Sequence, residues 1–155
     1  MTESRIVAVL NSSEDTTDML RVWLEMEGYT VVTAFTHAIR DGKVDFEALM
    51  RQHRPRVIVY DVSVPYDANW RLFRHIQDTP AAEGVTFVVT TTNGDRLREV
   101  AGQEATGVLE IVGKPYDADE LSRLVGEGFK SSEGGDDHRR PSAGSSRPLA
   151  FRRGR

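Results

Sequence analysis

The chain has 155 residues, a net charge of −4 and no cysteine. This length fits one domain with a real hydrophobic core, and the lack of cysteine excludes disulfides and thiolate metal sites. We find no apolar run of about 18 residues and no basic, apolar start typical of a signal peptide, so we expect a cytoplasmic protein without a membrane span.

Charge and composition divide the chain in two. Residues 131–155 are rich in Ser, Gly, Pro and Arg, and their six arginines against three acids leave residues 1–130 with a charge of −7. The C-terminal segment has too few apolar residues to offset its ordering entropy. We therefore expect a folded domain over residues 1–130 and a disordered tail over residues 131–155.

Apolar periodicity predicts an alternation of strands and helices within residues 1–130. Short apolar runs predict strands at residues 5–10, 29–34, 56–60, 85–90 and 108–112. Amphipathic segments predict helices at residues 16–28, 45–54, 69–77, 95–103 and 117–129. Gly28 and Pro55 mark the ends of the first two helices. Strands that alternate with helices form a parallel sheet covered on both faces, so the predicted fold class is α/β.

In such a sheet, functional groups gather at the carboxyl ends of the strands. Asp61 follows the third predicted strand, Thr91 the fourth and Lys114 the fifth. A carboxylate, a hydroxyl and an ammonium at one edge suit a phosphoryl group, with the carboxylate as nucleophile and the other two groups on phosphoryl oxygens. Each residue also has a structural explanation, as a turn residue, a strand former or part of a Lys-Pro loop dipeptide.

The motifs VIVYDVSVP, FVVTTTNGD, VGKPYDADEL and EGYTVVTA resemble the receiver domains of bacterial two-component response regulators, over residues 5–129. The resemblance implies a flavodoxin-like, doubly wound sheet of five parallel strands with five helices. It also implies that Asp61 accepts a phosphoryl group from a sensor histidine kinase, and that Thr91 and Lys114 contact that group. Asp61 and the backbone carbonyl of Ser63 would then bind Mg²⁺.

The chain departs from the receiver pattern after its first strand. Receivers carry two adjacent acids there, whereas this chain has Asn11 and Ser12. Mg²⁺ is usually held by carboxylates, so we expect weak Mg²⁺ binding and slow phosphoryl transfer. Glu14 or Asp15 could act as a displaced ligand; alternatively, Ser12 or Ser13 caps the first helix and the acids favour its positive end.

Three further departures concern the switch region and one loop. Ile111 stands where receivers often have an aromatic switch residue, and Thr92 is bulkier than the small residue usual at its position. Residues 35–42 form an apparent insertion of about seven residues relative to that pattern.

Two functions follow from these observations. The chain is either a single-domain response regulator phosphorylated at Asp61, or a pseudo-receiver that binds proteins without phosphate. The resemblance implies that partner contacts, including a possible homodimer, use residues 95–129. An enzyme is not expected, because no Gly-rich phosphate loop follows the first strand and the four histidines form no ligand spacing. Nucleic-acid binding by the Arg-containing tail is a weaker alternative to plain disorder.

Overall fold

The structure is a computed structural model, and it describes residues 5–101, 108–113, 117–134 and 150–152. The strands are β1 (Ile6–Asn11), β2 (Thr30–Phe35), β3 (Val57–Asp61), β4 (Thr86–Thr91), β5 (Val108–Gly113) and β6 (Ala150–Arg152). The helices are α1 (Glu14–Met26), α2 (Thr36–Arg40), α3 (Phe46–His53), α4 (Tyr66–Gln77), α5 (Gly94–Ala101) and α6 (Ala118–Gly134), with a 3₁₀ turn at Pro80–Ala82. All five predicted strands and all five predicted helices are present.

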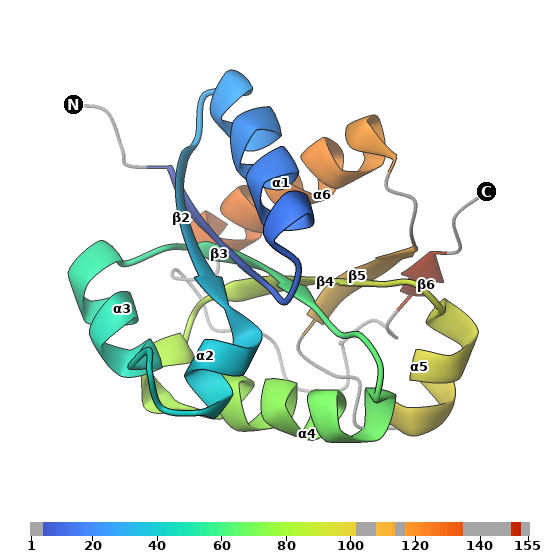
Figure 1. The fold of residues 1–155 in the computed structure, drawn as a ribbon. Coiled ribbons are helices and arrows are strands. Elements are labelled where there is room, and N and C mark those ends of the chain that lie inside the picture. The colour runs from blue at the N-terminus through green and yellow to red at the C-terminus, as the bar shows by residue number, and fades with distance from the viewer. Residues whose placement is uncertain (1–4, 102–107, 114–116, 135–149, 153–155) are drawn as a thin grey trace.

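The strands form one sheet in the order β2-β1-β3-β4-β5-β6, and every neighbouring pair is parallel. The first five strands follow the flavodoxin-like order, in which ligands bind at the carboxyl ends of the strands beside the first and third strands. The sheet has helices on both faces, with α1 and α6 on one side and α2 to α5 on the other (Figure 1). The predicted doubly wound α/β fold is therefore confirmed.

Two hydrophobic clusters lie on the two faces of the sheet, because successive strand residues point to opposite sides. Val57 and Val59 of β3 pack with Leu20 and Leu24 of α1 and with α6. Ile58 and Tyr60 pack on the other face, within a cluster that holds Trp70, Phe73, Phe87 and Leu97. This alternation also decides on which side each polar residue at the strand ends lies.

Two glycines shape α1 and α6. Gly28 follows the end of α1 with a φ of +100°, a left-handed conformation that favours glycine, as predicted for this helix stop. Gly128 lies inside α6, which continues to Gly134. A Cβ at residue 128 would lie 3.0 Å from a methyl group of Val57, so glycine here lets α6 pack closely on the sheet.

Two expectations need correction. The apparent insertion at residues 35–42 contains a sixth helix, α2, directly after β2. The boundary at residue 130 is too early, because α6 reaches Gly134, and residues 150–152 form β6 alongside β5. The prediction of a disordered tail is therefore wrong for residues 131–134 and 150–152, and residues 135–149 and 153–155 lie outside the described part.

Within the described ranges, no helix is long and apolar enough to cross a membrane.

Candidate functional site

Three polar side chains meet at the carboxyl edge of the sheet. Asp61 ends β3 and is in register with Thr90 of β4. On the other side of β3, Leu10 of β1 is in register with Tyr60, which puts Asn11 beside Asp61 at the strand ends. All three side chains are buried, with Asn11 1%, Asp61 4% and Thr90 0% exposed. The sheet topology thus brings together residues that are far apart in the sequence.

Asp61 and Thr90 are directly bonded. The Thr90 hydroxyl Oγ1 donates a hydrogen bond of 2.8 Å to Oδ1 of Asp61. Hydrogen bonds to an ionised carboxylate are stronger than neutral ones, and this one lies away from competing water. The bond fixes the position of the Asp61 carboxylate relative to β4.

Thr91, the predicted phosphoryl-contacting residue, lies on the other side of the sheet. It follows Thr90 in β4, so its side chain points to the opposite face. Its Oγ1 accepts a long hydrogen bond of 3.4 Å from the Asn93 backbone N–H. The hydroxyl placed on Asp61 is therefore that of Thr90, and the phosphoryl contact of Thr91 stays a prediction.

The end of β1 is organised as a helix cap. The Oδ1 atom of Asn11 accepts a 2.9 Å hydrogen bond from the backbone N–H of Ser13. Ser13 is the N-cap of α1, and its Oγ accepts a 3.2 Å bond from the backbone N–H of Thr16. Of the two capping candidates, Ser13 is confirmed and Ser12 is not.

Glu14 and Asp15 occupy the first turn of α1 and are exposed. Acidic side chains in this turn favour the positive end of the helix dipole. This position agrees with the capping explanation for both acids, and no described contact brings either carboxylate to Asp61.

The backbone carbonyl of Ser63, a predicted Mg²⁺ ligand, already has a side-chain partner. The Asn69 amide Nδ2 in α4 donates a 2.8 Å hydrogen bond to it. This bond ties the loop after β3 to the first turns of α4.

These donors fit a magnesium site poorly. Mg²⁺ prefers octahedral oxygen coordination with one or two carboxylates. Asp61 is the buried carboxylate at this edge among the described residues, whereas the Asn11 and Ser63 oxygens accept hydrogen bonds from within the protein. The described residues contain no group of three or more acidic, histidine or cysteine side chains that could hold a metal ion.

A second hydrogen bond crosses the outer rim. The Tyr66 hydroxyl, at the start of α4, lies 2.7 Å from Oγ1 of Thr92, just past β4. The bond joins the two loops that follow the strands of Asp61 and Thr90. Neither this pair nor the role of Asn69 was predicted, because no local motif indicates contacts between separate loops.

Tyr60 precedes Asp61 and points into the opposite cluster. Burial raises the pKa of its hydroxyl, and the negative charge of Asp61 raises this pKa further. Tyr60 is therefore neutral at physiological pH and adds no charge to the site.

The structure describes little about two of the predicted site residues, Lys114 and Ile111. Lys114 lies outside the described residues. Ile111 lies in β5, in register with Val89 of β4 and Phe151 of β6.

Known proteins share this fold. A proposed response regulator from Chloroflexus aurantiacus J-10-fl is 20% identical, with a TM-score of 0.65 over 83% of this chain and 99% of that one. A response regulator receiver domain protein from Clostridium thermocellum is 19% identical, with a TM-score of 0.63 over 83% and 97%. A receiver protein from Pseudomonas putida is 20% identical, with a TM-score of 0.63 over 82% and 99%. The chain has the fold of response regulator receiver domains.

Sequence similarity is more limited. No family model matches the chain. An uncharacterized 14.6 kDa protein from Leptolyngbya boryana is 30% identical over 121 residues, which cover 77% of this chain and 86% of the relative. The chain belongs to the same family as this protein.

Proposed function

We propose that the chain is a receiver-type signalling domain in which Asp61 accepts a phosphoryl group from a sensor histidine kinase. The observation that carries the proposal is the buried contact between Asp61 and Thr90 at the carboxyl edge of a receiver fold. A carboxylate held in place by a neighbouring hydroxyl suits phosphoryl transfer, because the protein's part in this reaction is mainly positioning and charge stabilisation.

In the proposed reaction, a carboxylate oxygen of Asp61 attacks the phosphorus of a phosphohistidine. An O–P bond forms, the N–P bond breaks, and the imidazole leaves with its electron pair and takes up a proton. Thr90 then shifts its hydrogen bond to a phosphoryl oxygen, the role first expected of Thr91. Lys114 would neutralise a second oxygen, as the resemblance implies.

Mg²⁺ enters the proposal only as a weakly bound ion. When bound, it would neutralise charge on the phosphoryl oxygens, and Asp61 with the Ser63 carbonyl would be its protein ligands. Asn11 and Ser12 stand where receivers have two metal-binding acids, so we expect slow phosphoryl transfer to Asp61.

The output of the domain is proposed to be protein contact, and no enzymatic activity of its own is proposed. Residues 95–129 comprise α5, β5 and most of α6, and they are the expected surface for a partner or a second copy. The described structure adds β6 along the outer edge of β5. A strand at that edge occupies backbone groups that a partner strand would otherwise use.

A second candidate is a pseudo-receiver that binds partners without phosphorylation. The hydrogen bonds at the end of β1 favour it, because Asn11 and Ser13 cap α1 where a receiver would bind metal. In that case the Asp61–Thr90 bond would be purely structural.

The test is incubation of the protein with acetyl phosphate and Mg²⁺, followed by intact mass spectrometry. We expect a slowly formed phosphoryl adduct on the wild type and none on Asp61→Asn, which keeps the shape of the side chain and removes its charge. Absence of an adduct on both proteins, with a kinase as well as with acetyl phosphate, would contradict phosphorylation. Unchanged partner binding by Asp61→Asn would then support the pseudo-receiver.

A further inference from the structure

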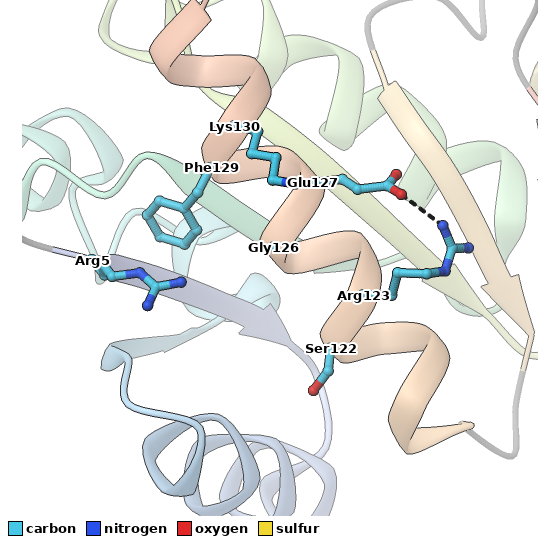
Figure 2. Close-up of a pocket in the computed structure, with 7 residues that line it drawn as sticks. All are labelled: Arg5, Ser122, Arg123, Gly126, Glu127, Phe129 and Lys130. Carbon is cyan, nitrogen blue, oxygen red and sulfur yellow. Dashed lines mark hydrogen bonds and ion pairs between the residues drawn. The ribbon is translucent and has the colours of Figure 1, made fainter.

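A cationic pocket lies at the amino edge of the sheet, at the opposite ends of the strands from Asp61. It lies between the residue before β1 and residues 122–130 of α6, and its cavity volume is about 400 Å³. Its lining residues are Arg5, Ser122, Arg123, Gly126, Glu127, Phe129 and Lys130 (Figure 2). The pocket shares no residue with the Asp61 site.

Arg5 is held in place by two aromatic rings. Tyr29 and Phe129 stack with their ring centres 5.3 Å apart, and the Arg5 guanidinium carbon lies 4.6 Å from the Tyr29 ring centre and 5.6 Å from that of Phe129. The Arg5 Nη2 also donates a 3.3 Å hydrogen bond to the Tyr29 hydroxyl. A guanidinium ordered in this way loses less side-chain entropy when it binds an anion.

The end of α6 is anchored by a second arginine. The Arg56 guanidinium carbon lies 5.3 Å from the Phe129 ring centre, and its Nη2 donates a 3.4 Å bond to the Phe129 backbone carbonyl. These two contacts hold the Phe129 wall of the pocket in place.

The charges in the pocket do not cancel. Arg123 forms ion pairs with Glu127 at 2.7 Å and with Glu120 at 3.1 Å, so one guanidinium is shared by two acids, of which Glu127 lines the pocket. Among the described residues, no carboxylate lies within ion-pair distance of Arg5 or Lys130. Arg5 and Lys130 therefore contribute two positive charges, and Arg123 with its two acids contributes one negative charge, so these five described side chains have a net charge of +1. The half-buried Ser122 also lines the pocket.

The chemistry of the lining indicates the ligand. Two cations with a hydroxyl match a dianion with several acceptor oxygens, and a guanidinium fork matches the spacing of phosphate oxygens. Residues 1–130 carry a charge of −7, so the surrounding surface would repel a long polyanion. We infer that the amino-edge pocket binds a small phosphate-bearing ligand through Arg5, Lys130 and Ser122.

The test is a titration of the ¹⁵N-labelled full chain with inorganic pyrophosphate, followed by amide chemical shifts at constant ionic strength. We expect saturable shifts at Arg5, Ser122, Gly126 and Lys130. Lys130→Gln removes one pocket charge from an exposed side chain and should weaken binding about fivefold, the effect of losing one partly exposed charge contact. Lys43→Gln makes the same charge change at an exposed site away from the pocket and should change the affinity less than about twofold, because salt screens distant charges.

Three results would overturn the inference. They are an absence of saturable shifts in the pocket, equal weakening by Lys130→Gln and Lys43→Gln, and equal affinity for succinate, which would indicate a carboxylate rather than a phosphate site. Arg5→Lys provides a second check, since it keeps the charge and loses the guanidinium fork, so it should also weaken pyrophosphate binding.

Discussion

The end of β1 and the ends of β3 and β4 lie at the same edge of the sheet but are built differently. At β3 and β4, Asp61 and Thr90 form a buried pair that joins a carboxylate to a hydroxyl. At β1, Asn11 accepts a bond from the backbone of Ser13, which in turn caps α1. The first region is the site of the proposed phosphoryl chemistry, whereas the second uses its polar atoms to stabilise a loop and a helix.

The difference shows that the fold does not require the acidic pair of receivers. Two carboxylates beside Asp61 would repel it and each other in a buried site unless a cation were bound. Asn11 has nearly the shape of an aspartate without the charge, so it can occupy the same buried position without a metal ion.

We expect the largest difference in the free energy of unfolding between variants of the two neighbouring threonines of β4, Thr90 and Thr91. Thr90→Val keeps the side-chain shape and removes the hydrogen bond to a buried carboxylate, which should lower the free energy of unfolding by about 2 kcal/mol. Thr91→Val loses only a long bond to the Asn93 backbone and should cost less than about 1 kcal/mol. Urea unfolding of both variants measures the difference. Equal losses would mean that the Asp61–Thr90 bond has no special strength.

We expect a smaller difference in the free energy of unfolding between variants of Ser13 and Ser12, which follow β1. Ser13→Ala removes the N-cap bond to Thr16 and should lower the free energy of unfolding by about 1 kcal/mol. Ser12 is exposed, so Ser12→Ala should change this free energy by less than about 0.5 kcal/mol. Chemical denaturation of the two proteins side by side provides the measurement, and a larger loss for Ser12→Ala would contradict the assignment of the cap.

We expect the smallest loss of stability from removing the hydrogen bond between Tyr66 and Thr92. Tyr66→Phe removes the hydrogen bond to Thr92 between partly exposed groups and should cost about 0.5 kcal/mol, since water replaces much of the lost bond. Amide hydrogen exchange should be faster in the loop at residues 62–65 than in the wild type. Unchanged exchange there would show that the bond does not hold the two loops together.

Much of this architecture was predictable because the hydrophobic pattern is strong. The run before Asp61 is apolar on both faces of the strand, which indicates a buried parallel strand and places the acid at its end. The short helix α2 was missed because five residues are too few for a helical period to be recognised.

The identity of the residues that contact Asp61 could not be predicted, because it depends on the pairing register of the strands. Thr90, Thr91 and Thr92 are adjacent in the sequence, so residue type does not distinguish them. Only the pairing of β3 with β4, which puts Thr90 opposite Asp61, decides which hydroxyl reaches the carboxylate. In the same way, Ser12 and Ser13 are equivalent caps in the sequence, and the backbone path after β1 selects Ser13.

The central claim is that the edge of the sheet retains a working acceptor and has lost its metal ligands. The most direct test is the rate of phosphorylation by acetyl phosphate in the double variant Asn11→Asp with Ser12→Asp, compared with the wild type. The account predicts a rate at least about tenfold higher that depends on Mg²⁺ and disappears when Asp61→Asn is added. A double variant that folds, binds Mg²⁺ and still reacts no faster than the wild type would contradict it.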